Sequence, residues 1–211
     1  MDVNRPMADA GSREKELTHE RLTARFDELM HDYDLGRRVE TLVDDFLRGD
    51  LRGKFVLDAG CGVGGLTKTL VARGARVVAL DIGPTLAATT RERCRCAAVV
   101  TTLSSIGLNA NSFDVVFSTE AIEHTPNPRQ SVVELYRLVK PGGHLAVTTP
   151  NRLWQMPVRV ASAIGLRPYD GYENFLWPSD LRHTLSAAGA EILEHRGLHL
   201  WPFQVSPLKG A

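Results

Sequence analysis

Short apolar segments recur along the middle of the chain, and each ends in glycine, proline or a polar residue. These segments are 54–60, 75–81, 96–102, 112–119 and 144–150. The stretches between them have the apolar spacing of helices, at 66–74, 84–96 and 128–139. Strands that alternate with helices in this way predict a doubly wound, Rossmann-like α/β fold, with a mostly parallel sheet and helices on both faces.

The N-terminal part has a different pattern. Residues 1–15 are polar and small, and we expect them to form a disordered tail. Apolar positions then recur at three- and four-residue steps, which predicts cap helices over 16–53 with Phe26 and Tyr33 on one face. We expect the rest of the chain, 16–211, to form one domain.

The C-terminal part completes the predicted domain around a core at 54–150. Aromatic residues among prolines and glycines predict a lid insertion at 151–178, after the fifth strand. Residues 179–211 are predicted to supply a helix and a sixth strand over 191–201. Pro202 interrupts the apolar residues that follow, so the seventh strand is predicted to be short or absent.

Composition and charge exclude several classes of protein. Lys plus Arg is 25 and Asp plus Glu is 25, so the chain lacks the basic excess of a nucleic-acid binder. Its 3 cysteines exclude a disulfide scaffold and fit a reducing compartment. No apolar stretch approaches the ~18 residues of a membrane span, and the N-terminus lacks a signal-peptide pattern. We therefore expect a soluble, cytoplasmic protein.

The most informative stretch is a glycine-rich turn after the first predicted strand. Gly60, Gly62 and Gly64 let the backbone turn tightly and approach a ligand closely. Asp58 precedes the glycines, and Asp81 ends the next predicted strand. In a doubly wound sheet, both features lie at the carboxyl ends of adjacent strands, where ligands bind. A carboxylate at Asp81 suits the hydroxyls of a ribose, although a turn with no ligand is the alternative.

The spacing of the glycines separates two kinds of nucleoside cofactor. A dinucleotide site has the pattern G-x-G-x-x-G, whereas this chain has G-x-G-x-G after an acidic residue. The carboxylate of Asp58 repels a pyrophosphate and attracts an amino group. The pattern therefore favours a nucleoside that bears an amino acid, and a nicotinamide-dependent oxidoreductase is the weaker alternative.

Four motifs occur together in one order: VLDAGCGVGG, VVALDIG, SFDVVFSTEAIEHTPNP and LVKPGGHLAVTTPN. Together they resemble a class I S-adenosylmethionine-dependent methyltransferase, and the small-molecule branch with the ubiquinone- and menaquinone-type enzymes is the most similar. The resemblance covers 54–150 and implies S-adenosyl-L-methionine as the cofactor. It further implies that Asp58 faces the amino group of the methionine part and that Asp81 holds the ribose hydroxyls.

The remaining cofactor residues are also implied by the resemblance. The methionine part would be cradled by the glycine turn, which includes Cys61 as a small filler, and lined by Glu120. Ile82 would lie against the adenine. The family usually has an Asp after its third strand, and Thr102 and Leu103 occupy that position here, so a hydroxyl replaces the usual acid.

Methyl transfer to oxygen or nitrogen can require a base, and His124 is the candidate because it follows the fourth predicted strand. A purely structural role for His124 is the alternative. Glu120, Glu123 and His124 could instead hold a divalent metal, as in some similar quinone O-methyltransferases. Cys94 and Cys96 form a C-x-C pair that we interpret as a solvated helix end, not as a metal site.

We therefore predict an enzyme, a methyltransferase of small-molecule biosynthesis whose acceptor atom is a hydroxyl oxygen. Phe26, Tyr33, Trp154 and Tyr172 are the candidate substrate-binding residues, because acceptor pockets have apolar and aromatic walls. N- or C-methylation of a small molecule, and a non-catalytic cofactor-binding protein, are the alternatives. The expected partner is a small-molecule acceptor without nucleic acid, and the chain is expected to be a monomer or homodimer.

Overall fold

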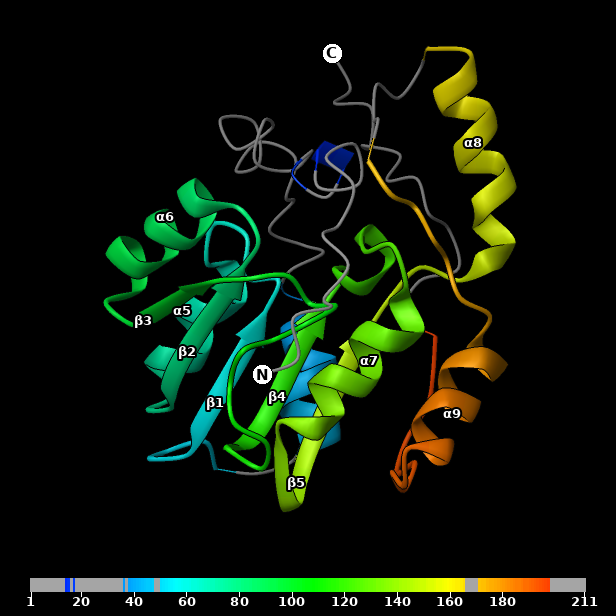
Figure 1. Ribbon diagram of the computed structural model, residues 1–211. Coiled ribbons are helices and arrows are strands. Elements are labelled where there is room, and N and C mark those ends of the chain that lie inside the picture. The colour runs from blue at the N-terminus through cyan, green and yellow to red at the C-terminus, as the bar shows by residue number, and fades with distance from the viewer. Residues whose placement is uncertain are drawn as a thin grey trace, which may run out of the picture.

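A parallel five-stranded sheet with the order β3-β2-β1-β4-β5 forms the centre of the described chain (Figure 1). The computed structural model describes residues 14–15, 17, 36, 38–47, 50–165 and 171–197. The strands are β1 (Phe55–Ala59), β2 (Arg76–Asp81), β3 (Ala97–Val100), β4 (Phe113–Thr119) and β5 (Val139–Thr148). Every strand pair is parallel, which confirms the predicted doubly wound fold.

Helices cover both faces of this sheet. They are η1 (Glu40–Leu47), α5 (Gly65–Ala72), α6 (Pro84–Cys94), η2 (Ile122–His124), α7 (Pro128–Arg137), η3 (Arg152–Trp154), α8 (Gln155–Ala163) and α9 (Pro178–Ala187). Figure 1 shows α7 in front of the sheet and α5 behind it. Because the strands are buried on both faces, they are apolar at nearly every position rather than at alternate ones.

Alternate residues of one strand therefore enter two separate cores. Val56 packs in the core that contains Leu66 and Leu70 of α5. Its neighbour Leu57 packs in the core that contains Leu135 of α7. This alternation follows from the period of two in a strand, and it fixes which face each helix must cover.

The fifth strand begins earlier than the sequence pattern predicts. We expected the preceding helix to continue to Val139 and the strand to span 144–150, but α7 ends at Arg137 and β5 starts at Val139. Val139 already pairs with Phe113, and a register shift follows before His144 pairs with Val115. The Pro-Gly-Gly sequence at 141–143 therefore lies within the irregular part of β5 and does not form a break between α7 and the strand.

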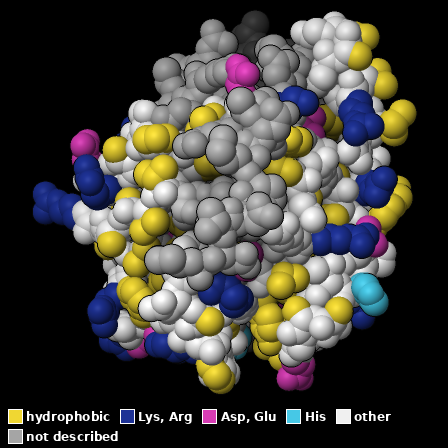
Figure 2. Space-filling model, in the orientation of Figure 1, with side chains coloured by type: hydrophobic (Ala, Val, Ile, Leu, Met, Phe, Trp, Pro, Cys, Tyr) yellow, Lys and Arg dark blue, Asp and Glu magenta, His cyan; other side chains and the backbone are white. Residues whose placement is uncertain are grey.

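The segment after β5 contains more helix than expected. The predicted lid at 151–178 includes η3 and α8, and a parallel bridge joins Asn151 to Leu176. Val158 of α8 is buried, whereas other apolar side chains of η3, α8 and the residue after α8 are exposed, and apolar side chains are visible at the upper right of Figure 2. These exposed side chains are Leu153, Met156, Val160 and Ile164.

The predictions for the two ends of the chain, a sixth strand near the C-terminus and a disordered N-terminal tail, are described only in part by the structure. Residues 191–197 form no strand, so the sixth strand is wrong over that range, and 198–211 lie outside the described residues. Glu14 and Lys15 are helical, and residues 1–13 lie outside the described residues, so the expected tail stays a prediction. No helix in the described ranges is long and apolar enough to cross a membrane.

Candidate functional site

The glycine turn adopts a backbone that side chains disfavour. Gly60, Gly62 and Gly64 have φ values of 84°, 54° and 91°. A Cβ atom on Gly60 would lie 2.3 Å from the Cβ of Ala121, in the loop after β4. Glycine is therefore required at this position both by the dihedral angle and by the close approach of a neighbouring segment.

Asp81 connects the second strand to this turn. Its carboxylate accepts hydrogen bonds from the backbone N–H of Gly62 and from that of Gly83, each at 2.9 Å. The side chain is buried at the carboxyl end of β2. The structure thus brings together the two features that the sequence placed at adjacent strand ends.

Asp58 lies at the end of β1 and is almost completely buried. The hydroxyl of Thr67, in the first turn of α5, donates a 2.5 Å hydrogen bond to its carboxylate. Burial raises the pKa of Asp58 to about 6, the Thr67 hydrogen bond opposes this rise, and the charge of Asp81 adds to it. Two carboxyl groups therefore destabilise each other's charge at the same end of the sheet.

Side chains of α6 hold the turn from its other side. The Thr90 hydroxyl donates to the carbonyl of Gly62 at 2.8 Å, and the Cys94 thiol lies 3.6 Å from the carbonyl of Gly64. Thr90 and Thr67 could not be predicted from the sequence, because a helical threonine has no pattern along the chain that marks its partner. Cys61 is buried, and burial raises the pKa of its thiol, as expected for a filler rather than a nucleophile.

The loop after β4 supplies the second half of the site. Glu120 has a positive φ of 48°, and its N–H donates to the carbonyl of Thr148 at the end of β5. The carboxyl of Glu123 is buried and accepts a 3.2 Å hydrogen bond from the hydroxyl of Thr149. Burial raises the pKa of Glu123 well above its usual range, the neighbouring Glu120 adds to the rise, and Arg38 opposes it.

His124 ends the short helix η2 and makes a hydrogen bond that fixes its tautomer. Its Nδ1 lies 2.8 Å from the carbonyl oxygen of Tyr172. A carbonyl only accepts, so Nδ1 holds the proton, and the basic lone pair of the neutral ring is on Nε2. The Nε2 atom lies 3.9 Å from a carboxylate oxygen of Glu123, and the His124 side chain is 20% exposed.

The alternative metal site would require Glu120, Glu123 and His124 to converge. Within the described residues, no group of three or more His, Cys, Asp or Glu side chains could hold a metal ion. The carboxyl of Glu123 is hydrogen-bonded to Thr149, and the Nδ1 of His124 is hydrogen-bonded to Tyr172.

The other predicted site residues differ in burial and in their distance along the chain from the glycine turn. Ile82 and Thr102 are half-buried after β2 and β3, whereas the Leu103 side chain packs in the core on the α7 face. Trp154 and Tyr172 are half-buried on the two arms of the segment after β5. The remaining two candidates for the acceptor, Phe26 and Tyr33, lie outside the described residues.

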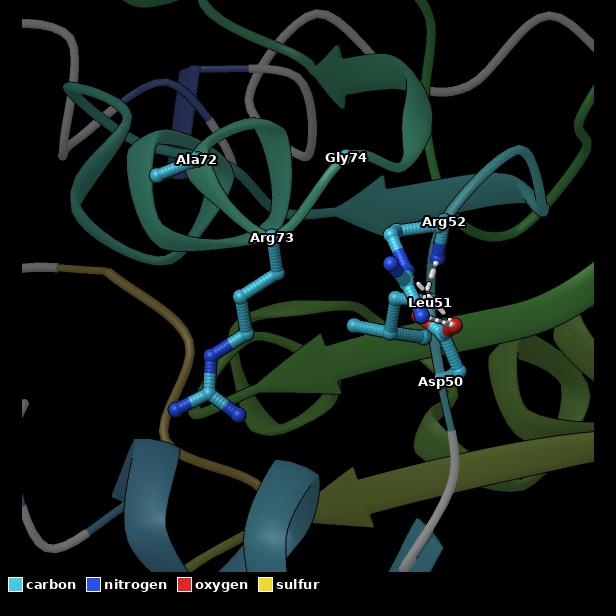
Figure 3. Close-up of a pocket in the computed structure, with 6 residues that line it drawn as sticks. All are labelled: Asp50, Leu51, Arg52, Ala72, Arg73 and Gly74. Carbon is cyan, nitrogen blue, oxygen red and sulfur yellow. Dashed lines mark hydrogen bonds and ion pairs between the residues drawn. The ribbon is translucent and has the colours of Figure 1, made fainter.

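A hollow of about 600 Å³ lies elsewhere, beside the amino ends of β1 and β2 (Figure 3). It is lined by Asp50, Leu51, Arg52, Ala72, Arg73 and Gly74. Arg52 is paired with Asp50, and Arg73 is paired with Asp44 on η1. Its arginines are thus neutralised by neighbouring acids, and it lies at the end of the sheet opposite the glycine turn.

Comparison with known proteins decides the family. Residues 57–147 match a family described as a methyltransferase domain. A ubiquinone biosynthesis O-methyltransferase of Acinetobacter baumannii is 34% identical over 170 residues, which cover 73% of this chain and 70% of that protein. The chain belongs to the class I S-adenosylmethionine-dependent methyltransferases. The predicted family and its cofactor, S-adenosylmethionine, are therefore confirmed.

Solved structures show how widely this methyltransferase fold is used. A possible histamine N-methyltransferase of Thermotoga maritima has a TM-score of 0.67 at 19% identity and covers 82% of this chain and 80% of its own. A cyclase has a TM-score of 0.67 at 20% identity and covers 87% and 73%. At such identities, the likeness establishes the fold alone.

The residues of the methyltransferase fit its cofactor. S-adenosylmethionine has an ammonium group and a sulfonium, and the chain supplies Asp58 and Asp81 at adjacent strand ends. Burial and the charge of Asp81 raise the pKa of Asp58, and the hydroxyl and backbone of Thr67 compensate its charge only in part. A cation beside Asp58 would remove this penalty.

Because Gly60 approaches Ala121 closely, we expect the addition of one methyl group at Gly60 to lower the stability of the fold strongly. Gly60→Ala is expected to lower the free energy of unfolding by about 3 kcal/mol, because strain at positive φ adds to a clash between Cβ atoms. Gly189 is the matched control, since its φ is 91° but a Cβ atom there meets nothing within 4 Å. Gly189→Ala should cost only about 1 kcal/mol. Equal losses in urea unfolding would contradict the packing role of Gly60.

The buried charge of Asp58 predicts a pH-dependent cost. Its folded pKa of about 6 lies above the unfolded value of about 3.9, so the native state binds the proton more tightly. The cost is therefore complete above about pH 6 and absent below about pH 4. In the cofactor-free chain, Asp58→Asn should raise the free energy of unfolding by roughly 2–3 kcal/mol at pH 7 and leave it unchanged at pH 4. Denaturant titrations at both pH values test this, and a less stable variant at pH 7 would refute it.

Proposed function

We propose that this methyltransferase transfers the methyl group of S-adenosylmethionine to a hydroxyl oxygen of a small-molecule acceptor. The observation that carries the proposal is the hydrogen bond between Nδ1 of His124 and the carbonyl of Tyr172. This bond leaves the basic lone pair on Nε2, where it can accept the proton of a hydroxyl group. The similarity to relatives named O-methyltransferases supports the same acceptor atom.

The cofactor-binding roles are part of the proposal. Asp58 would bind the ammonium of the methionine part, and Glu120 would line the same part. Asp81 would accept hydrogen bonds from the ribose hydroxyls. Each of its carboxylate oxygens accepts one hydrogen bond from a backbone N–H, and a carboxylate oxygen can accept more than one. Ile82 would lie against the adenine, and Thr102 would offer its hydroxyl to the adenine amino group.

The position of Leu103 restricts its role. Because its side chain packs in the core with residues of α7, only the backbone of Leu103 would face the cofactor. No acid replaces the Asp that the family usually has here. We therefore expect adenine recognition to rest on stacking and neutral hydrogen bonds, which contribute about 1 kcal/mol each.

The chemistry requires alignment more than activation. The cofactor supplies an activated methyl group when bound, and methyl transfer is an in-line displacement. His124 would remove the acceptor proton through Nε2. Trp154 and Tyr172, on the segment after β5, would hold the acceptor and exclude water from it, together with Phe26 and Tyr33.

Two other functions remain as proposals of second rank. N- or C-methylation of a small molecule would use the same cofactor residues. A protein that binds the cofactor without catalysis would have the same fold. We further propose a cytoplasmic monomer or homodimer that binds no nucleic acid.

Methyl-labelled S-adenosylmethionine distinguishes these functions. We expect the purified chain to transfer the label to an ortho-diphenol, and not to a primary amine of similar size. His124→Gln should lower kcat by about 100-fold with little change in cofactor affinity, because it removes a base that acts only on the acceptor. Transfer to the amine alone would favour N-methylation, and cofactor binding without transfer to any acceptor would favour the non-catalytic alternative.

Asp81 tests the cofactor site separately. Asp81→Ala should weaken S-adenosylmethionine binding by about 1–3 kcal/mol, since charge-assisted hydrogen bonds to the ribose are lost. Calorimetry measures the affinity. Because Asp81 also ties down the amide of Gly62, Thr90→Val is the control: it removes a hydrogen bond to the turn without removing a proposed ligand contact. An equal loss of affinity in both variants would show that Asp81 acts only through the turn.

A further inference from the structure

Residues 171–176 form an extended strap that lies against the turn containing His124. Two connections fasten the strap to the segment that precedes it in the chain. Asn151 forms a parallel bridge with Leu176, in which the N–H of Arg152 donates to the carbonyl of Leu176. The side chain of Gln155, at the start of α8, donates to the carbonyl of Glu173 at 2.8 Å.

A single residue of the strap bonds to the carbonyls of the two residues on either side of His124. The backbone N–H of Asn174 donates to the carbonyl of Glu123 at 2.9 Å. Its side-chain amide donates to the carbonyl of Thr125 at 2.8 Å. Asn174 thus spans the end of η2, with one bond before His124 and one after it.

The turn itself is anchored independently of the strap. The Thr125 hydroxyl donates to the carbonyl of Ile122 at 2.6 Å, and the Ser131 hydroxyl of α7 donates to the Thr125 hydroxyl at 3.0 Å. These bonds fix the turn on α7. The strap must therefore be placed relative to an anchored turn, and two bonds from Asn174 join the strap to that turn in addition to the bond between Nδ1 of His124 and the carbonyl of Tyr172.

Placement of the strap determines the tautomer of His124. The carbonyl that accepts from Nδ1 belongs to Tyr172, only two residues before Asn174. If this carbonyl moved away, the ring could protonate on either nitrogen, and the fraction with its lone pair on Nε2 would fall. Charged groups near this turn are the carboxyls of Glu123 and Glu120 and the guanidinium of Arg38, and the ammonium of Lys15 lies 5.7 Å from the centre of the Tyr172 ring.

We propose that Asn174 is a positioning residue for His124, acting through the carbonyl of Tyr172. Its side chain holds the strap so that this carbonyl keeps the proton on Nδ1 and directs Nε2 toward the acceptor. The catalytic consequence rests on the proposed role of His124 as the base. The effect on the tautomer does not rest on that role, so the two can be tested separately.

Nitrogen NMR of the full chain labelled with ¹⁵N-histidine measures the tautomer directly. The chain has 7 histidines, and the signals that disappear in His124→Gln identify the one of interest. In Asn174→Ala, which keeps the backbone bond to Glu123, we expect the His124 signals to shift from the Nδ1-protonated pattern toward an average of both tautomers. Gln155→Ala is the matched control, because it removes an amide bond that joins the strap to α8 and not to the turn.

Kinetics gives a second, independent measure. If His124 is the base, Asn174→Ala should lower kcat by about 10-fold and change the KM for S-adenosylmethionine by less than about two-fold. Asn174→Asp provides a variant of the same size whose side-chain oxygen cannot donate to the carbonyl of Thr125. We expect Asn174→Asp to show the same shift of tautomer and the same loss of rate. It replaces the alanine variant if thermal unfolding shows that Asn174→Ala does not fold.

The outcomes separate the two proposals. An unchanged tautomer in folded Asn174→Ala or Asn174→Asp overturns the positioning role, whatever the rate. A changed tautomer with an unchanged rate supports the positioning role and removes His124 as the base. A tautomer that changes equally in Gln155→Ala also overturns it, because the strap as a whole would then act in place of Asn174.

Discussion

A buried negative charge at the carboxyl end of β1 is the constraint on which the site depends. Asp58 is enclosed by the sheet and α5, its partner is the neutral hydroxyl of Thr67, and Asp81 stands at the end of the neighbouring strand. Water cannot compensate a charge in such a place, so the folded chain tolerates it at a cost in stability. In the role proposed for Asp58, a cofactor with an ammonium group and a sulfonium would turn this cost into affinity. The same carboxylate would favour a cationic nucleoside over a pyrophosphate.

The topology of the sheet explains where the parts of the site meet. The strand order reverses between β1 and β4, where the β1–β2–β3 half of the sheet meets the β4–β5 half. The loops that follow the strands of the two halves diverge at that point. The glycine turn comes from one half and the turn that contains His124 comes from the other. The contact between Gly60 and Ala121 shows how closely these loops approach. The proposed cofactor residues and the candidate base thus lie at the carboxyl ends of the strands, although they are distant in sequence.

The common fold does not by itself establish the reaction. Structures with similar TM-scores include a possible N-methyltransferase and a cyclase, so the fold is compatible with different chemistry. The features of this chain that bear on its proposed reaction surround His124. The strap after β5 supplies a carbonyl to the imidazole, and its Asn174 bonds to the carbonyls of Glu123 and Thr125. Segments of this kind vary in length and sequence on a constant core, so they are where a methyltransferase can acquire its own acceptor.

The sequence by itself determined the parallel sheet, the glycine turn and the pairing of that turn with Asp81. These features depend on local pattern, because apolar strands, glycines at positive φ and acids at strand ends are each visible within a few residues. Only the tertiary structure decided the early start of β5, the absence of a strand over 191–197 and the roles of Thr67, Thr90 and Asn174. Each of these depends on partners from other elements: Phe113 for the strand, Asp58 and Gly62 for the threonines, and the carbonyls beside His124 for the asparagine. A hydroxyl or amide has no pattern along the chain that shows which distant group it will meet, since folding brings the partners together only once the sheet and its loops are in place.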